Sequence, residues 1–496
     1  DELKKQLAKR KKEGTTQKIV VIIDDGLIEA ESDRGDQETT DEKTKAYLKA
    51  AGHDVEKDVV IIRWDGGESI KNQAIAQSRI NDFYQKAHEI GFDKQGTVIA
   101  IGGFAVMDVA RAAAATFHRG VHFIAIPTTG VGQFDAGAGV KGGMNMLFKT
   151  PDKSFDELKN YIGVFHPPAA VLVDPNFLHS SLLPAEDYKG GLAEAIKVAL
   201  VRGPELFELI EGNVAELLTQ NIQPDSMSEG IQMISLKIHS DQIATNPNEM
   251  GEGRPLDYGH WTAHKMESLT RNGPTQVKHG TAVAFGSSID AVYSHLNGLI
   301  SAKDLERILK LYENLGLPTF IDDKRITPDT LWPGLEEFRL HLGGPLTISL
   351  LGGIGVEQVV HEIDRKKFEA AFQYLKKRFE ARAEVRAIEF EFGKGIATVV
   401  QNEIKTHMET SGIYENVKRV KAEKSDSVQL EFTVETGKHT VSFLVDNISK
   451  KFPAKGDEED EGYLVRIDNA YQSAPTKKTR RTWNGFIRLI QNRLVW

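Results

Sequence analysis

Two histidines, His260 and His264, lie four positions apart in the stretch RPLDYGHWTAHKMESL, and His279 follows nearby. Four residues is close to one helical turn, so the imidazoles of the pair would project side by side. Such a pair can bind a metal, but histidines that share a helix face are often purely structural. The pair alone leaves both possibilities open.

A carboxylate that could complete a metal site lies in the helical pattern GGLAEAIKVAL, where Glu194 and Lys197 are three residues apart. Charged side chains are rarely buried without partners, and this pattern is otherwise apolar, so Glu194 requires a cation. Glu194, His260 and His279 could form a two-histidine, one-carboxylate zinc site with an open position, as catalytic zinc requires. The alternative is that Glu194 and Lys197 form an ion pair on a solvated helix face. The spacing of the three residues matches no short zinc motif, so the chemistry alone leaves both possibilities open.

A Gly-Gly turn, Gly102 and Gly103 in VIAIGGFAVMDVARAAAAT, indicates a second site. Glycines between a strand and a helix let a diphosphate approach the backbone and the helix N-terminus. The turn is not the G-x-G-x-x-G fingerprint, and an ordinary tight turn would look the same. However, the polar turns WDGGESIKN and IPTTG also follow expected strands, and ligands bind at the carboxyl ends of such strands. The three turns together predict a nucleotide site.

The elements that would position these residues alternate from residue 18 onwards. Apolar, β-rich runs predict strands at 18–24, 58–64, 96–103 and 121–129, and helical patterns at 41–52, 69–91 and 105–117 lie between them. Strands that alternate with helices in this way indicate a parallel sheet covered on both faces.

A mostly helical region follows, and the strand signal nearly vanishes up to residue 385. Helices are expected at 191–201, 204–220, 228–244, 280–298, 301–316 and 365–384, with one short strand at 346–351. The last stretch changes character again: 427–446 alternates around a Thr-Gly turn as a hairpin does, and 463–467 resembles a strand. The closing segment 480–496 is expected to be an amphipathic helix on a small α+β domain, or a contact to a membrane surface or nucleic acid.

The composition is that of a globular protein. The 496 residues suffice for two or three domains, with 40% hydrophobic and 27% charged residues. A net charge of -9 argues against general nucleic-acid binding, and no apolar run approaches the ~20 residues that cross a bilayer. Without cysteine there are no disulfides or thiolate ligands, and the N-terminal stretch lacks a secretory core. We therefore expect a cytoplasmic protein with no nucleic-acid or membrane partner.

The motifs, taken in order, resemble those of 3-dehydroquinate synthase and the wider sugar phosphate cyclase superfamily. The resemblance runs from about residue 18 to 385, through GGESIKN, IGGFAVMD, RGVHFIAIPTTGVGQFDAGAGVKGGMN, KNYIGVFHPPAAVLVD, LPAEDYKGGLAEAIK, LDYGHWTAHKME and HGTAVAFG. It implies an N-terminal parallel-sheet α/β nucleotide-binding domain plus a C-terminal mostly α-helical metal domain, with NAD and a divalent metal in the cleft. We place these domains at 1–183 and 184–388, and an extra α+β domain at 389–496, outside the resemblance.

The resemblance also implies roles for individual residues. It makes Glu194, His260 and His279 the ligands of a divalent metal, zinc or alternatively cobalt, and His264 a substrate-side or proton-transfer group. Positions that match contacts to the substrate's phosphate and hydroxyls are Arg119, Asp135, Lys141, Asn160, Lys197 and Lys237. Positions that match the lining of the NAD site are Asp24, Glu68, Lys71, Gly102, Gly103, Asp108, Thr128, Thr129 and Lys159.

The chemistry implied by the resemblance is a cycle on one sugar phosphate. NAD takes a hydride from a ring carbinol whose oxygen lies on the metal. The new ketone acidifies the neighbouring C–H, phosphate leaves by β-elimination, the hydride returns, and an intramolecular aldol reaction closes a carbocycle. The cofactor ends unchanged, so the protein mainly orients one substrate through several steps.

Several residues depart from the family pattern. Phe104 replaces the third glycine of the usual triplet, Thr281 replaces the glutamate of HGE, and LLGGIG lacks a common arginine. Asp257 stands where asparagine is typical, and Arg254 lies six rather than seven residues before His260. The family's arginine near this position faces the substrate carboxylate, so these two changes bear on which heptulose phosphate is used.

Other functions fit the same motifs. The leading hypothesis is a 3-dehydroquinate synthase-like cyclase, a phosphate-eliminating lyase acting on a small sugar phosphate, and a homodimer is expected. The alternatives are a valiolone-synthase-like cyclase that uses a heptulose phosphate without a carboxylate, a metal-dependent polyol dehydrogenase, and an inactive scaffold with a C-terminal interaction domain. Net NADH release would separate the dehydrogenase from the cyclases, and phosphate release would separate the cyclases from the scaffold.

Overall fold

The computed structural model describes residues 2–9, 17–149, 155–246, 254–271, 276–382, 416–424, 427–434, 437–446 and 464–466. The chain divides into two compact units, residues 1–376 and 377–496. The first unit contains both the sheet and the helical region. The boundaries predicted at 183/184 and 388/389 stay predictions.

A five-stranded parallel sheet forms the N-terminal half of the first unit. Its strand order is β2 (Val59–Trp64), β1 (Ile19–Asp24), β3 (Thr97–Gly102), β4 (His122–Pro127) and β7 (Ala170–Val171). The four strands predicted from apolar runs are the first four of these. Because β2 and β3 flank β1 on opposite sides, the chain changes direction across the sheet at β1, and such a switch point is where α/β sheets bind ligands.

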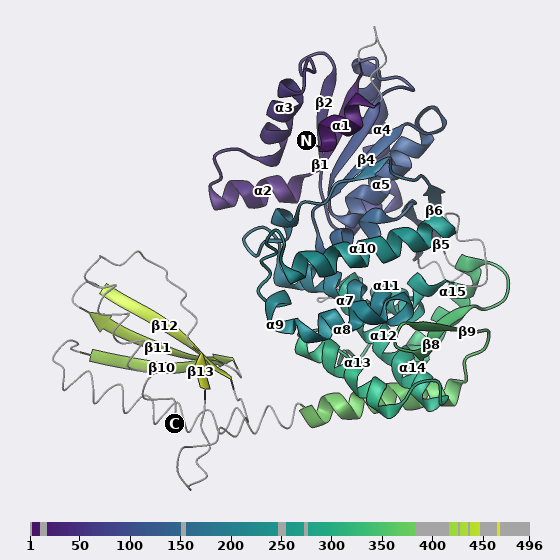
Figure 1. Cartoon of the computed structure of the whole chain (residues 1–496), viewed down its shortest axis with the longest axis vertical. Helices are drawn as coiled ribbons and strands as arrows, with labels where there is room; N and C mark the ends of the chain where they lie inside the picture. The colour runs from purple at the N-terminus through teal and green to yellow at the C-terminus, as the bar shows by residue number, and fades with distance from the viewer. Residues whose placement is uncertain are drawn as a thin grey trace. The chain divides into compact units, whose positions relative to one another are not determined.

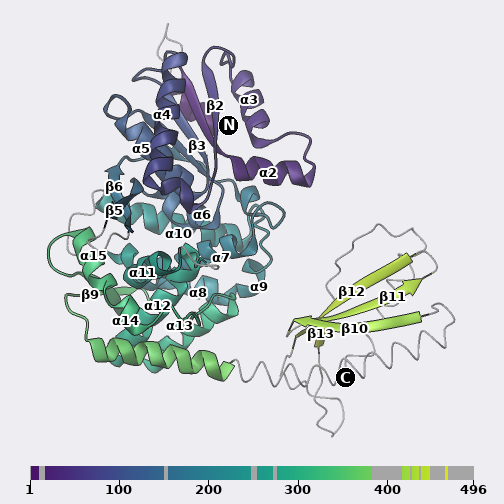
Figure 2. The same ribbon diagram turned by 180° about the vertical axis from the view of Figure 1, so that it is seen from behind.

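Helices cover both faces of this sheet, as the continuous apolar strands predict. Successive side chains of β1 point to opposite faces: Val20 and Ile22 join a core with α4 (Gln73–Glu89) and α5 (Phe104–Thr116). Val21 joins a core on the other face, with α1 (Glu2–Ala8), α2 (Asp25–Arg34) and α3 (Thr40–Ala50). Figures 1 and 2 show α4 and α5 on one side of the sheet and α2 and α3 on the other.

An antiparallel hairpin, β5 (Lys141–Lys149) and β6 (Phe155–Phe165), leaves the sheet region and packs against α5. The sequence did not predict this hairpin or α2. The short elements of this half are η1 (Glu68–Lys71), η2 (Phe117–Arg119), α6 (Gly130–Phe134), η3 (Ala136–Ala138) and η4 (Pro175–Leu178).

Helices dominate the rest of the first unit. They are α7 (Ala185–Arg202), α8 (Pro204–Gly212), α9 (Val214–Leu217), α10 (Met227–Thr245), η5 (Pro255–Asp257), α11 (His260–Thr270), α12 (His279–Leu296), α13 (Ala302–Asn314), α14 (Pro328–Leu331), α15 (Gly334–Leu342) and helical residues from 365 onwards. The strand expected at 346–351 is part of a hairpin, β8 (Ile348–Gly353) with β9 (Val356–Val360). The helix expected at 204–220 is broken at Asn213, whose φ of -124° is not helical.

The second unit contains an antiparallel sheet in the order β10 (Asn416–Lys424), β11 (Ser427–Val434), β12 (Gly437–Asp446) and β13 (Leu464–Arg466). Strands β11 and β12 pair from Val434 opposite Gly437, which is the hairpin expected at 427–446. The closing helix expected at 480–496 lies outside the described residues. In the described part of the chain, no helix is both long and apolar enough to cross a membrane.

Candidate active site

One cavity of about 510 Å³ collects side chains from both halves of the first unit. The α/β half contributes residues from η1, α5, β5 and β6, and the helical half contributes residues from α7, α10, α11 and α12. The predicted site residues that line it are Glu68, Lys71, Asp108, Asp135, Lys141, Lys159, Asn160, Glu194, Lys197, Arg254, Asp257, His260, His264 and His279.

The three predicted metal ligands meet in this cavity. One ligand atom from each of Glu194, His260 and His279 lies within 4.8 Å of the others. The Nδ1 atom of His260 is 3.0 Å from the carbonyl oxygen of Tyr258, so its Nε2 atom remains for another partner. His264 lies one turn further along α11, and its ring centroid is 5.4 Å from that of His260.

Glycines allow the helices to bring these side chains together. A Cβ atom on Gly280 would lie 2.1 Å from the Cα of Gly190, so α12 and α7 cross at van der Waals distance there. The contact places His279, which precedes Gly280, beside Glu194, one turn after Gly190. Gly259 has a φ of +75°, a conformation that favours glycine, and it turns the chain into α11 directly before His260.

Buried charges surround Glu194. Its Oε2 is 2.8 Å from Lys197 Nζ, and the same Nζ is 2.8 Å from Asp135 Oδ2. The other oxygen of Asp135, Oδ1, accepts a hydrogen bond from His239 Nδ1. Burial raises the pKa of Glu194, but Lys197 and the histidines outweigh that effect and hold it well below its usual value. Burial, with His260 beside it, lowers the pKa of His264 well below its usual value. This low pKa keeps His264 an uncharged imidazole at neutral pH.

A second run of paired charges crosses the cavity from the sheet side. Lys71 Nζ donates to Asp108 Oδ2 at 2.5 Å, and both residues are buried. Lys159 Nζ lies 3.2 Å from Glu68 Oε1 and 2.6 Å from Glu267 Oε1. Lys159 on β6 therefore joins the α/β half of the cavity to α11.

Two of the residues that depart from the family pattern, Arg254 and Asp257, pair with each other. Arg254 Nε donates to Asp257 Oδ2 at 2.6 Å, and Lys141 Nζ lies 3.9 Å from Asp257 Oδ1. Burial raises the pKa of Asp257, but Lys141 and Arg254 outweigh it and lower that pKa below its usual range. Asp257 is thus an anion that engages Arg254 at one end of the cavity.

Asn160 also faces this cavity. Its backbone has a φ of +51°, which asparagine tolerates better than most residues, and its Oδ1 is buried with no hydrogen-bond partner in the described part of the chain. An orphaned polar atom of this kind suits a ligand hydroxyl.

Five predicted cofactor residues lie at the carboxyl ends of the strands and do not line the cavity itself. Asp24 ends β1 and accepts hydrogen bonds from Gly26 N at 3.1 Å and Gly103 N at 3.3 Å. A Cβ atom on Gly66 would lie 2.3 Å from the Asp24 carboxylate, and one on Gly102 would lie 2.9 Å from the Asp24 Cβ. Only glycine at these two positions leaves room for the Asp24 side chain at the strand ends. The five residues are Asp24, Gly102, Gly103, Thr128 and Thr129.

Two predicted substrate residues lie elsewhere. Arg119 is exposed on η2 with a φ of +62°, and Lys237 pairs with Asp241 at 2.6 Å on the outer face of α10. Their roles stay predictions, but the cavity does not contain them. His239, two residues after Lys237, lines the cavity instead, and the sequence analysis missed it, as it missed Glu267. Helical spacing could have indicated both.

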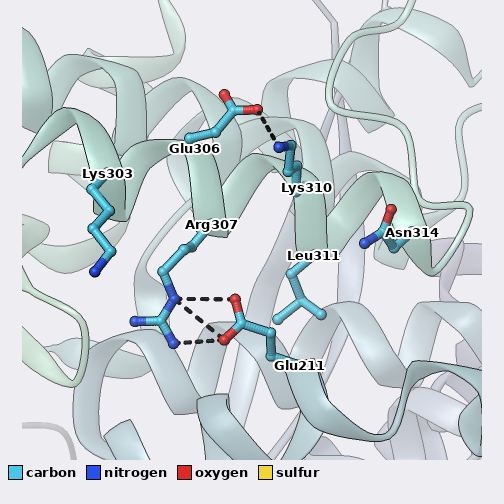
Figure 3. Close-up of a pocket in the computed structure, with 7 residues that line it drawn as sticks. All are labelled: Glu211, Lys303, Glu306, Arg307, Lys310, Leu311 and Asn314. Carbon is cyan, nitrogen blue, oxygen red and sulfur yellow. Dashed lines mark hydrogen bonds and ion pairs between the residues drawn. The ribbon is translucent and has the colours of Figure 1, made fainter. Parts of the chain in front are cut away.

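A surface groove between α8 and α13 also collects charged residues (Figure 3). Arg307 makes a bidentate contact to Glu211, with Nη2 2.6 Å from Oε2, and Lys310 Nζ lies 3.5 Å from Glu306 Oε1. These side chains are part-exposed and satisfy one another. The groove therefore offers a solvated surface rather than a reactive site.

Comparison with known proteins identifies the family. The 3-dehydroquinate synthase N-terminal profile matches residues 60–189, and the 3-dehydroquinate synthase C-terminal profile matches residues 191–335. A 2-epi-5-epi-valiolone synthase from Streptomyces hygroscopicus subsp. jinggangensis is 32% identical over 343 residues, which cover 68% of this chain and 77% of that protein. A 3-dehydroquinate synthase from Saccharopolyspora erythraea is 31% identical over 368 residues, covering 73% and 90%.

Solved structures agree with the sequence comparison. The 2-epi-5-epi-valiolone synthase of S. hygroscopicus, with NAD+ and Zn2+ bound, has a TM-score of 0.62 at 28% identity and covers 73% of this chain and 91% of its own. A 2-deoxy-scyllo-inosose synthase, complexed with carbaglucose-6-phosphate, NAD+ and Co2+, shares the fold with a TM-score of 0.59 at 21% identity, covering 75% and 94%. The resemblance and the fold class expected from the motifs are confirmed: the chain belongs to the 3-dehydroquinate synthase family.

Proposed function

We propose that the protein is an NAD- and metal-dependent sugar phosphate cyclase that eliminates phosphate, a carbon–oxygen lyase, from a heptulose-type substrate. The observation that carries the proposal is the convergence of Glu194, His260 and His279 with a neutral His264 in one charged cavity. The cavity reaches Phe104, the residue directly after Gly103 at the end of β3.

The donor atoms fit a divalent metal. Both carboxylate oxygens of Glu194 are buried and make no hydrogen bond to the described residues, although ion-pair partners lie close. Two imidazole nitrogens and one carboxylate oxygen form the ligand set of catalytic zinc, and cobalt accepts the same ligands. A divalent ion bound there would polarise a substrate oxygen. The relatives whose structures contain Zn2+ or Co2+ support this assignment.

The strand ends fit a dinucleotide. Asp24, at the switch point beside β3, offers a carboxylate, and Gly103 is the N-cap of α5, at whose N-terminus the helix dipole favours a phosphate. Bound NAD would supply a hydride acceptor that returns the hydride later in the cycle. Phe104 lies at the cavity edge with its ring centroid 5.4 Å from Lys71 Nζ, so this departure still leaves an aromatic wall for the nucleotide side.

The chain's own residues would bind the substrate and move its protons. His264 would accept or return a proton because it is neutral and lies beside His260. Lys197 is fixed between Glu194 and Asp135, so its ammonium is held rigidly for an oxygen of the substrate. Asn160, with its orphaned Oδ1, would accept a hydrogen bond from a hydroxyl.

We infer that the substrate presents a hydroxyl-rich end rather than a carboxylate near Asp257. Arg254, which would otherwise attract a carboxylate, is engaged by Asp257 at 2.6 Å. The carboxylate of Asp257 can itself accept hydrogen bonds from hydroxyls, and a site built for hydroxyls discriminates strongly against groups that cannot donate. The valiolone-synthase-like alternative is therefore favoured at this end of the cavity.

The test is phosphate release from a panel of heptulose phosphates, with and without a terminal carboxylate, in the presence of NAD and zinc. The proposal expects phosphate release with no net NADH, loss of activity with a chelator and recovery with zinc or cobalt. NADH accumulating in proportion to substrate consumed would instead identify a polyol dehydrogenase. No reaction with any member of the panel would favour the scaffold.

A further inference from the structure

Glu267 is a buried carboxylate in the cavity to which the proposed function assigns no role. It is 3% exposed and lies on α11, seven residues after His260 and three after His264, so all three side chains share one helix face. A carboxylate buried to this extent requires specific partners. Two partners are present, and they come from opposite sides of the cavity.

The first partner is His279. Glu267 Oε2 lies 3.2 Å from His279 Nδ1, while Nε2 of the same ring lies 3.1 Å from Glu194 Oε1. The imidazole is thus held with Nδ1 toward Glu267 and Nε2 toward Glu194 and His260. A metal-binding histidine commonly donates its second N–H to a carboxylate, which fixes the ring orientation and makes the ligating nitrogen more basic.

Glu267 could instead be a ligand itself, since His264, Glu267 and His279 also have donor atoms within 4.8 Å of one another. That alternative needs the Nδ1 of His279, the atom that already faces Glu267. It also leaves out His260, whose free Nε2 is set by its contact to Tyr258. The contacts therefore favour Glu267 as the residue that positions a ligand.

The second partner is Lys159. Its Nζ lies 2.6 Å from Glu267 Oε1 and 3.2 Å from Glu68 Oε1. Lys159 and Glu68 match positions that line the nucleotide site, so a single carboxylate contacts both a proposed metal ligand and the nucleotide side. The unbroken contact runs from His279 through Glu267 to Lys159.

We propose that Glu267 is a positioning residue that orients His279 for metal binding and, through Lys159, couples metal affinity to nucleotide binding. The proposal rests on the proposed function, because it takes the metal and NAD sites from there. A nucleotide that draws Lys159 toward itself leaves His279 as the main partner of Glu267. The hydrogen bond that His279 Nδ1 donates to Glu267 then strengthens, and Nε2 binds a metal more tightly.

The test measures the zinc Kd by competition with a chromophoric chelator, with and without saturating NAD. For the wild type, we expect NAD to tighten zinc binding about fivefold or more, as a coupling of about 1 kcal/mol would. Glu267→Gln keeps the side-chain volume but loses the charge, so zinc binding should weaken about 10- to 100-fold and the NAD effect should disappear. The visible absorption of the Co2+-loaded protein should change as well, because the His279 ligand would be differently oriented.

Two further variants separate positioning from general destabilisation. Glu31→Gln removes another buried carboxylate, which accepts from Thr40 N at 2.6 Å in the α/β half, and it should leave the zinc Kd and the Co2+ spectrum unchanged. Lys159→Met removes the lysine that Glu267 shares between the two sides. Without NAD it should bind zinc about as tightly as the wild type does with NAD, and NAD, at a concentration shown to saturate the variant, should tighten zinc binding no further.

The outcomes are distinct. A zinc Kd of Glu267→Gln within twofold of wild type, with an unchanged Co2+ spectrum, would overturn the positioning role. An equal NAD effect in wild type and Lys159→Met would overturn the coupling. A wild-type protein that binds neither zinc nor NAD would contradict the proposed function itself, before any variant is compared. If Glu267→Gln does not fold, Lys159→Met still decides the coupling.

Discussion

The active-site cavity and the α8–α13 groove contain the same residue types in different surroundings. In the groove, the side chains of Arg307 and Glu211 are 31% and 37% exposed. In the cavity, those of Lys197 and Glu194 are 2% and 1% exposed. Ion pairs in water contribute only ~0–1 kcal/mol, whereas buried charges persist only when each has a partner. Burial, rather than the presence of charges, therefore distinguishes the reactive site from the surface.

The ionisable side chains of the cavity form one connected chain. His239, Asp135, Lys197, Glu194 and His279 follow one another at contact distance, and the chain continues through Glu267 to Lys159 and Glu68. Each inner member contacts a neighbour on either side, so its removal takes one partner from two buried groups. The groove pairs are separate and can be removed one at a time. Mutations in the cavity should therefore reduce stability or activity much more than mutations in the groove.

The largest effect on activity is expected from substitutions of His260 and His264. His260→Ala removes a proposed ligand, so bound metal and activity should both be lost, by at least about 1000-fold in kcat/KM. His264→Ala should retain stoichiometric metal and lose about 100-fold or more in kcat, because only proton transfer is removed. Metal analysis of the purified variants beside steady-state kinetics checks both. Stoichiometric metal in both variants would make the ligand assignment wrong.

The next effect concerns stability. Lys197→Met leaves Glu194 and Asp135 buried without their shared cation, so the free energy of unfolding should fall by about 3–5 kcal/mol. Lys310→Met in the groove breaks a contact of similar type at an exposed position and should cost less than about 1 kcal/mol. Urea unfolding of the metal-free proteins measures both. If both variants lost the same free energy of unfolding, burial would not explain the difference between the cavity and the groove.

The sequence predicts the strands of the main parallel sheet better than the smaller elements around the cavity. Runs of valine and isoleucine predict β1 to β4, since only a sheet covered on both faces buries such strands completely. The β5–β6 hairpin was not predicted, because KGGMNMLFK lacks strict alternation and contains only one strong β-former, Phe148. Its pairing depends on contacts with α5, which is distant in the sequence.

The sequence likewise predicts only those residues of the candidate site that local spacing or motifs mark. Spacing and composition indicated Glu194, His260 and His279, whose helices meet through glycines that the sequence shows. Motif order also indicated Lys237, but the buried stripe of α10 contains Ser235 and His239, so helical periodicity argues for His239. Glu267 accepts a hydrogen bond from Lys159, which is 108 residues away in the sequence, and no local sequence pattern can predict a contact over that separation.

A pH-dependent prediction concerns Asp290 on α12, a buried carboxylate that holds the turn before His260. It accepts from Gly259 N at 3.0 Å and Trp261 Nε1 at 3.2 Å, and burial nevertheless raises its pKa to about 7. Between the unfolded pKa of about 3.9 and about 7, the folded state holds one more proton. Stability from this group is therefore present at low pH and is lost as pH rises toward 7.

Asp290→Asn should remove this dependence. The stability of wild type relative to the variant should fall by up to about 1.4 kcal/mol per unit as the pH rises from 5 to 7, and should then level off. Urea unfolding at pH 5, 6, 7 and 8 measures the difference. Asp323→Asn is the control, because Arg325 lowers the pKa of that partly buried carboxylate and no titration occurs in this range. Parallel curves for wild type and Asp290→Asn would contradict the prediction.

A smaller effect is expected on substrate choice. Asp257→Asn releases Arg254 and removes a negative charge, so kcat/KM for a carboxylated heptulose phosphate should rise about tenfold relative to a neutral-ended one, or about 1.4 kcal/mol. Full repulsion between bare carboxylates ~4 Å apart would be about 4 kcal/mol, but Arg254 and Lys141 compensate most of it. Both substrates are measured on both enzymes. A wild type that prefers the carboxylated substrate, with an unchanged ratio in the variant, would show that Asp257 does not select by charge.

The smallest effect should follow from mutations in the groove. Glu211→Gln breaks the bidentate contact to Arg307, yet water can solvate both groups at this exposed position (Figure 3). The free energy of unfolding should fall by less than about 1 kcal/mol, and kcat/KM should stay within twofold of wild type. Arg307→Gln should behave alike, apart from the loss of its packing against the Phe207 ring, whose centroid is 5.1 Å away. Adding salt should weaken the wild-type pair and leave the buried pairs of the cavity unchanged, because solvent ions screen only charges that they can approach. A salt-insensitive loss of several kcal/mol in Glu211→Gln would place the groove with the buried network rather than with the surface.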